Sequence, residues 1–259
     1  MSLIETQDHA HDVRELRLAR APVNALDATL CQALVVALDQ AASEGARGVV
    51  LSGAPGVFSG GMDVPWLLSL GSDQTAVLAG WESFFNVVRA LASAPLPVVA
   101  ALTGHAPAGG CVVALCCDYR VMAASRDAAK PFTIGLNETQ VGLVAPEGIQ
   151  RLLRRAVGEH RAAWLLMQGE LVSAEQAHAI GLVDELLDIE AVVPRSVAWL
   201  QTLLARPSAA MLQTRRIARA ALVEALHPDQ IQLERFVEAW TREETQQALQ
   251  AMVARVRKR

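Results

Sequence analysis

The chain has 259 residues and a formal net charge of −4, from 23 basic and 27 acidic side chains. Hydrophobic residues make up 52% of the chain, enough for one large domain with a buried core and for surface covered by other subunits. The mild acidity, without any basic block, argues against nucleic acid as the main partner.

The N-terminal segment MSLIETQDHAHDV is polar, and we expect it to be a frayed end. It has neither a basic start nor an apolar run, so it is no targeting peptide and a cytoplasmic protein is expected. Residues 90–117 carry no Asp, Glu, Lys or Arg and are long enough to span a bilayer. Prolines and glycines would break any single helix there, so we expect buried core and no membrane segment.

Strands and helices alternate along the first 195 residues, which predicts an α/β core. Alternating or continuous apolar runs predict strands at 13–19, 47–53, 118–124 and 181–187. Helical spacing predicts helices at 27–43, 74–93, 147–168 (broken near Gly158) and 173–180. A strand, a turn over TGHAPAGG and a helix are expected within 97–117, and a strand entering a short helix within 132–143.

After Pro194 the pattern becomes entirely helical, so residues 196–259 are predicted to form a separate helical region. Helices are expected at 196–205, 208–225 and 228–256, separated by prolines. The last helix carries an apolar stripe, formed by Leu233, Phe236, Val237, Trp240, Leu249, Met252, Val253 and Val256. Such a stripe is typical of packing on a core or on a sister subunit rather than on a ligand.

Two glycine-rich turns each enter a predicted helix, at 59–64 (SGGMDV) and 107–112 (PAGGCV). Backbone N–H groups at a helix start are free to bind a developing negative charge, and glycine lets a ligand approach them. The two turns could each supply one N–H to the same oxygen. Asp63 is expected to be a helix-start residue rather than a catalyst.

The run GLNETQVGL (135–143) carries one carboxylate, that of Glu138. Asn137 and Gln140 have the spacing of a helix cap and its third residue, which places Glu138 in the first helical turn. One interpretation is a carboxylate that favours the helix dipole. The other is a carboxylate in an apolar pocket with a raised pKa, suited to moving protons. No other charged residue lies between Lys130 and Glu147 to pair with it.

Several other chemistries are excluded. Lys130 and Lys258 are the only lysines and no Gly-Lys-Ser/Thr string exists, so a P-loop is absent. The only tyrosine, Tyr119, has no lysine four positions on, which excludes a Tyr-x-x-x-Lys dehydrogenase. The histidines form no metal-binding motif, and the cysteines lie in apolar surroundings without paired spacing. We therefore expect no metal site.

In this order, the segments resemble the crotonase (enoyl-CoA hydratase/isomerase) superfamily. The likeness covers almost the whole chain and includes PVNAL (22–26), RGVVLSGAPGVFSGGMD (47–63), GHAPAGGCVVALCCDYRV (104–121) and GLNETQVGLVAP (135–146). Within the superfamily the chain is most similar to the mitochondrial-type Δ3,Δ2-enoyl-CoA isomerases. The resemblance implies a spiral of ββα turns followed by C-terminal helices that help assembly into homotrimers or dimers of trimers.

The resemblance also assigns roles by position. It implies an acyl-CoA thioester substrate, with CoA as part of the substrate and no separate cofactor. It places the two oxyanion-hole N–H groups at Met62 and Gly109 and the catalytic carboxylate at Glu138. The remaining residues implied to bind the substrate are Asn24, Ala25, Leu26, Gly60, Gly61, Asp63, Val64 and Asn137.

One departure from the hydratase pattern bears on the reaction. Hydratases carry a second glutamate after the glycine turn, in GGGCE, and Val112 stands at that position here. Hydration needs one group to orient water and another to transfer a proton, whereas moving a double bond needs a single carboxylate. This favours a 3-enoyl-CoA isomerase of fatty acid β-oxidation. The alternatives are hydration supported by another carboxylate, with Glu147 nearest in sequence, and acyl-CoA binding without turnover.

Overall fold

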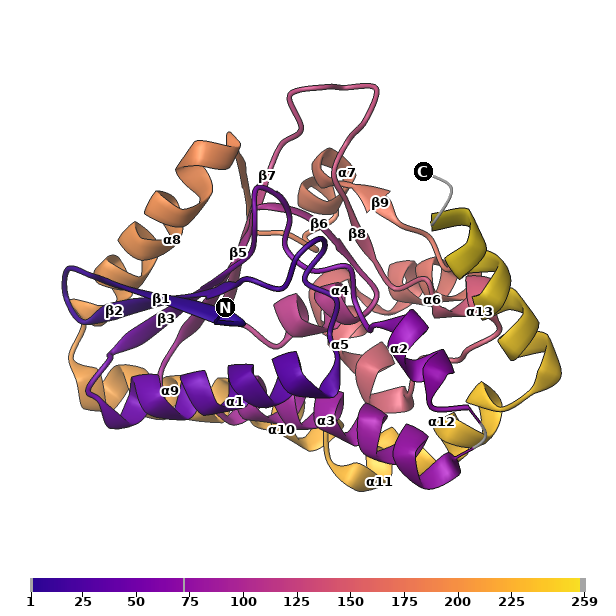
Figure 1. Cartoon of the computed structure of the whole chain (residues 1–259). Helices are drawn as coiled ribbons and strands as arrows, with labels where there is room; N and C mark the ends of the chain where they lie inside the picture. The colour runs from indigo at the N-terminus through magenta and orange to yellow at the C-terminus, as the bar shows by residue number, and fades with distance from the viewer. Residues whose placement is uncertain (1, 72, 257–259) are drawn as a thin grey trace.

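The computed structural model describes residues 2–71 and 73–256. It shows a sheet layered between helices, and the C-terminal part of the chain adds further helices (Figure 1). The larger sheet has the strand order β1-β2-β3-β5-β7-β10. Its strands are β1 (Ile4–His9), β2 (Val13–Leu18), β3 (Gly48–Ser52), β5 (Val98–Leu102), β7 (Tyr119–Ala123) and β10 (Glu185–Leu187). Neighbouring strands run parallel except for the antiparallel pair β1 and β2.

The central strands are buried on both faces, which explains their continuous apolar runs. Along β3, Val49 and Leu51 belong to the larger core cluster, while Val50 between them belongs to a second cluster. This alternation places successive side chains on opposite faces of the sheet. Helix α8 (Ile189–Leu204) covers one face, and α1 (Ala28–Ser43) and α3 (Gln74–Ser93) lie on the other (Figure 1).

A smaller sheet continues from the larger one and sets the position of the site. Its strand order is β4-β6-β8-β9, with β4 (Gly56–Val57), β6 (Gly104–Pro107), β8 (Thr133–Gly135) and β9 (Val172–Ser173). Each of β3, β5 and β7 is followed by one of its strands and then by a helix, which confirms the predicted spiral of ββα turns. Because β4, β6 and β8 are parallel neighbours, the turns that follow them meet at one edge.

The helices that follow those turns are short. They are α2 (Val64–Ser69), α4 (Gly109–Leu115) and the 3₁₀ helix η1 (Glu138–Val141). Beyond η1 the chain forms α5 (Glu147–Val157), α6 (Glu159–Gln168) and α7 (Ala174–Ala179), which confirms the break near Gly158. The predicted start of α1 is also confirmed, because the Asp27 side chain accepts a hydrogen bond from Leu30 N.

Three expectations for the core were wrong. The N-terminal segment is not frayed, because β1 pairs along its whole length with β2. The segment TGHAPAGG is not a turn throughout, since β6 occupies its first half. The helix expected at 196–205 begins at Ile189 and continues through Pro194, so residue 195, the predicted end of the core, lies inside α8.

The C-terminal part is more divided than expected. It consists of α9 (Ser208–Ala218), α10 (Ala220–Ala225), α11 (Pro228–Ile231), α12 (Leu233–Trp240) and α13 (Glu243–Val256). Helix α12 packs on α3, and α13 packs on η1 and α2, so these C-terminal helices fold back onto the part of the chain that follows the glycine turns (Figure 1). Within the described ranges, no helix combines the length and the apolar character needed to cross a bilayer.

Candidate active site

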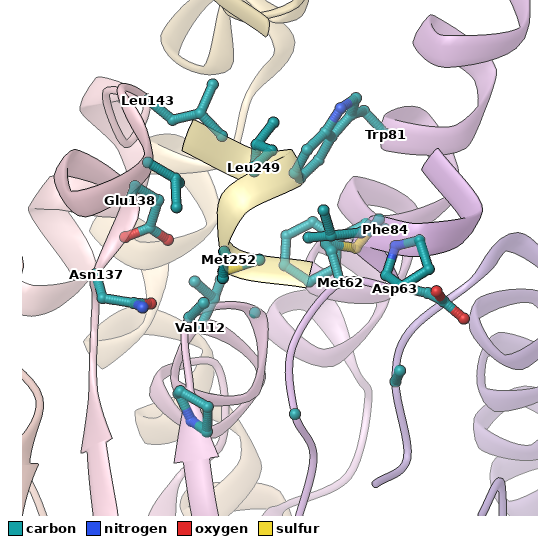
Figure 2. A pocket seen from close by; sticks show the side chains of 18 of the residues that line it. Met62, Asp63, Trp81, Phe84, Val112, Asn137, Glu138, Leu143, Leu249 and Met252 are labelled. Atoms are coloured by element: carbon teal, nitrogen blue, oxygen red, sulfur yellow. The ribbon is translucent and has the colours of Figure 1, made fainter. Parts of the chain in front are cut away.

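A cavity of about 550 Å³ lies where the turns after β4, β6 and β8 meet (Figure 2). Residues of α12 and α13 also line it. Its wall is mostly apolar, and aromatic side chains form a large part of it. Eight of the residues assigned from the sequence line it, namely Ala25, Gly60, Met62, Asp63, Val64, Gly109, Asn137 and Glu138.

The other three assigned residues, Asn24, Leu26 and Gly61, lie behind the wall. Leu26 N donates to Gly61 O over 2.8 Å, and Asp63 N donates to Leu26 O over 3.0 Å. The buried Asn24 side chain donates to Phe58 O over 3.0 Å. These bonds hold the segment 24–26 against the first glycine turn. Within this segment, Ala25 faces the cavity and Asn24 and Leu26 do not.

The two glycine turns touch each other. Gly61 has a φ of +83°, and a Cβ added there would lie 3.1 Å from Gly109 N. A Cβ added to Gly109 would lie 3.3 Å from Met62 N. Glycine favours this approach, because a Cβ at either position would make a tight contact and Gly61 also has a positive φ. The approach brings the N–H groups of Met62 and Gly109 to the same part of the cavity wall.

Both N–H groups are available to a ligand. Gly109 is the first residue of α4, so its N–H has no acceptor within the helix. Ala108 before it has a φ of +47°, a strained value for a residue with a side chain, and donates to Gly135 O over 2.8 Å. Among the residues that the structure describes, neither Met62 N nor Gly109 N donates to a backbone oxygen.

Glu138 extends into the cavity from the first residue of η1 (Figure 2). The predicted place in a first helical turn is confirmed, although Asn137 makes no capping bond with its side chain. Within the described part of the chain, no cation forms an ion pair with Glu138. Because protein surrounds its carboxyl, burial raises the pKa of Glu138 from 4.5 to about 7.

Asp63 is the other carboxylate of the wall, and it is already engaged. Its Oδ2 accepts from the Arg20 guanidinium over 2.7 Å, and its Oδ1 accepts from Trp66 N over 3.0 Å. The second bond caps α2, as expected for a helix-start residue. The wall therefore carries one paired carboxylate, Asp63, and one in apolar surroundings, Glu138.

At the position where hydratases carry their second glutamate, this chain places an apolar side chain in the cavity wall. Val112, on α4, lines the cavity and is buried. Glu147 does not line the cavity: it is exposed on α5, and its Oε1 lies 3.1 Å from both Arg151 Nε and Arg154 Nη1. Its neighbours Pro146 and Ile149 face the cavity instead.

Sequence reasoning missed much of the wall. Trp81 of α3 packs edge to face with Phe236 and Trp240 of α12, at ring separations of 4.7 and 5.5 Å. From the predicted C-terminal stripe, Phe236, Trp240, Leu249, Met252 and Val253 line the cavity, so the expectation that the stripe does not face a ligand was wrong for them. The Val256 side chain lies outside the described residues.

No metal centre is found within residues 2–71 and 73–256, where no three His, Cys, Asp or Glu side chains are grouped to hold an ion. The cysteines are free and buried. Burial raises the pKa of the Cys31 thiol to about 12, so it is poorly suited to act as a nucleophile or a metal ligand.

Comparison with known proteins agrees with this architecture. The family model for enoyl-CoA hydratase/isomerase matches residues 8–258. The human mitochondrial enoyl-CoA delta isomerase 1 is 31% identical over 254 residues, covering 96% of this chain and 82% of its own. A probable enoyl-CoA hydratase, EchA17, of Mycobacterium tuberculosis is 33% identical over 198 residues, covering 76% of this chain and 72% of its own.

A solved structure shows the same fold over nearly the full length. The crystal structure of human mitochondrial delta3-delta2-enoyl-CoA isomerase superposes with a TM-score of 0.91 at 29% identity, covering 99% of this chain and 98% of that one. The chain therefore belongs to the enoyl-CoA hydratase/isomerase family of the crotonase superfamily.

Proposed function

We propose that the protein is a Δ3,Δ2-enoyl-CoA isomerase that moves a 3-enoyl-CoA double bond to the 2-trans position. The observation that carries the proposal is that the cavity wall contains Glu138 and, at the place of the second hydratase glutamate, the apolar Val112. Glu138 is the one carboxylate of the cavity wall, within the described residues, that has no cationic partner, and Val112 occupies the place where hydratases have their second glutamate.

The proposed reaction is a 1,3-proton transfer. Met62 N–H and Gly109 N–H donate to the thioester oxygen, and Glu138 removes one C2 proton from the 3-enoyl-CoA. The electron pair of the broken C–H bond passes to the thioester oxygen, giving a dienolate that the two donors stabilise. Glu138 then returns the proton at C4, which leaves the double bond between C2 and C3. Losing one oxyanion donor typically costs about 10²–10³ in rate.

The pKa of Glu138 suits this cycle. A carboxylate must first accept a proton and then release it, and such a group works best when its pKa lies near the working pH. At a pKa of about 7, the ionised and protonated forms of Glu138 are both accessible at neutral pH. The apolar wall that raises this pKa also keeps bulk water from competing for the dienolate.

The substrate would lie along the cavity. We place the CoA moiety at the segment around Ala25, and the acyl chain against the aromatic wall formed by Trp81, Phe236 and Trp240. Neither a metal nor a separate cofactor enters the proposed reaction. We also propose assembly as a homotrimer or a dimer of trimers, and a role in fatty acid β-oxidation.

The relatives include enzymes named as isomerases and others named as hydratases, so hydration is the competing reaction. It would need a second carboxylate, and Glu147 points away from the cavity into an ion pair with Arg151 and Arg154. The position of Glu147 therefore favours isomerisation.

The test offers two substrates to the same preparation. Conversion of a 3-enoyl-CoA is followed by the appearance of the conjugated thioester, and hydration of a 2-enoyl-CoA by its loss. Isomerisation that outpaces hydration by a hundredfold or more supports the proposal. Hydration at a comparable rate would overturn it, and binding of both compounds without turnover would indicate an acyl-CoA-binding protein.

A further inference from the structure

The turn that carries Glu138 is held from two sides. On the side of α6, Thr139 Oγ1 donates to Leu166 O over 3.2 Å, and Gln140 Nε2 donates to Gly169 O over 2.7 Å. On the other side, Thr245 Oγ1 of α13 donates to Gly142 O over 3.2 Å. Because α13 comes from the end of the chain, the position of Glu138 depends on a segment about a hundred residues away.

Thr245 sits directly on the end of the turn. Gly142 caps η1 with a φ of +75°, and a Cβ added there would lie 3.0 Å from Thr245 Oγ1 and 3.3 Å from Thr245 Cα. Thr245 is 1% exposed, although the residues on either side of it are not buried. A threonine in a helix can donate its hydroxyl to the carbonyl one turn earlier in the same helix. The Thr245 hydroxyl donates to Gly142 O instead, and this bond ties α13 to the turn that carries Glu138.

The same face of α13 lines the cavity. Leu249 lies one helical turn after Thr245, and residues four apart share a face of a helix. Leu249 and Met252 line the cavity (Figure 2). Val253 lines it too. A group that fills this part of the cavity therefore presses on the helix that also holds the turn of Glu138.

We infer that Thr245 is a positioning residue that couples occupation of the apolar cavity to the placement of Glu138. An acyl chain long enough to contact Leu249 and Met252 fixes α13, and Thr245 passes this constraint to Gly142 and the turn. Part of the binding energy of the acyl chain is then used to orient the base, so it appears in kcat rather than in KM. This inference rests on the proposed function, in which Glu138 is the base.

The test compares two substitutions at Thr245 with a matched control. Thr245→Val keeps the shape and removes the hydroxyl, whereas Thr245→Ser keeps the hydroxyl. Thr241→Val is the control, because Thr241 is an exposed threonine at the end of α12 whose hydroxyl donates to Glu238 O within its own segment. Each variant is assayed with a short-chain and a long-chain 3-enoyl-CoA, and folding is checked by thermal unfolding.

We expect Thr245→Val to lower kcat on the long substrate by roughly tenfold to a hundredfold, the cost of misplacing a catalytic group by about 1 Å. KM should change less than twofold, and kcat on the short substrate should fall much less. Thr245→Ser and Thr241→Val should stay within about twofold of the parent. If the valine variant does not fold, Thr245→Ala, which removes the hydroxyl without steric conflict, replaces it.

Two failures are distinguishable. If the parent enzyme converts the substrate and Glu138→Gln abolishes this, but removal of the Thr245 hydroxyl leaves kcat unchanged or alters KM alone, the coupling is overturned and the proposed function stands. An equal loss of kcat on both substrates also overturns the coupling. If the parent enzyme does not isomerise either substrate, the proposed function itself fails.

Discussion

The apolar setting of Glu138 should make the stability of the protein depend on pH. In the unfolded chain the carboxyl has its ordinary pKa of 4.5, and in the folded protein burial raises it to about 7. Between these values the folded state binds more protons than the unfolded state, so the free energy of unfolding falls as the pH rises. The stabilising contribution is present in full below pH 4.5 and is lost as the pH rises through about 7.

Glu138→Gln removes this titration while keeping the shape of the side chain. A pKa displaced from 4.5 to about 7 corresponds to at most about 3 kcal/mol between the two protonation states. Since part of the side chain is open to the cavity, solvent lowers this, and we expect about 1–3 kcal/mol. The glutamine variant should therefore gain that much stability over the parent on going from pH 5 to pH 8.

Urea unfolding of both proteins at several pH values measures the difference directly. Glu147→Gln serves as the control, because it removes an exposed carboxylate that lies outside the cavity. A difference between parent and Glu138→Gln that stays constant from pH 5 to pH 8 would refute the reasoning, because Glu138 would then titrate alike in both states. For Glu147→Gln, in contrast, we expect the difference in unfolding free energy from the parent to stay constant over this pH range.

Three further predictions concern the site and its support. The kcat/KM of the parent should rise roughly tenfold from pH 6 to pH 8 and level off, because the base must be ionised and the pKa of Glu138 is about 7; a flat profile over this range would contradict this role for Glu138. Gly109→Ala should lower kcat by about 10²–10³ with the fold intact by circular dichroism, since its Cβ would lie 3.3 Å from Met62 N; a loss below tenfold would remove Gly109 from the site. Asp118→Asn should destabilise the fold by roughly 3–5 kcal/mol in urea without changing kcat, because Asp118 Oδ1 pairs with both Arg215 and the buried Arg219 over 2.9 Å and its loss leaves Arg219 without a countercharge; an unchanged unfolding midpoint would show that these ion pairs are dispensable.

The central strands could be predicted because buried parallel strands carry unbroken apolar runs, as in GVVLS of β3. The ββα spiral was implied only by the resemblance to the crotonase superfamily. The strand β1 was missed because it lies at the edge of the sheet, where only Ile4 of its residues is buried and most of the others are exposed. β4 has two residues and β6 has four, and they contain glycine, histidine and proline, so no local pattern distinguishes them from turns.

The site was only partly predictable for a related reason. Glu138 stood out as the lone carboxylate of an otherwise uncharged stretch, and the glycine turns stood out by composition. Trp240 and Leu249 carried the same apolar spacing whether they faced a core, a subunit or a ligand. Their place in the wall depends on where the helices end and begin, at Gln232, where φ is +48°, and near Thr241. The continuous apolar stripe showed no sign of these interruptions.

The most direct test of the central claim is the rate at which the parent, Glu138→Gln and Glu147→Gln convert a medium-chain trans-3-enoyl-CoA. The 2-enoyl-CoA formed is read through added hydratase and dehydrogenase. Turnover by the parent, a loss of about 10²–10⁴ in Glu138→Gln and an unchanged rate in Glu147→Gln are the results predicted for a single-carboxylate isomerase. Equal rates in the parent and Glu138→Gln, or a loss confined to Glu147→Gln, would contradict it.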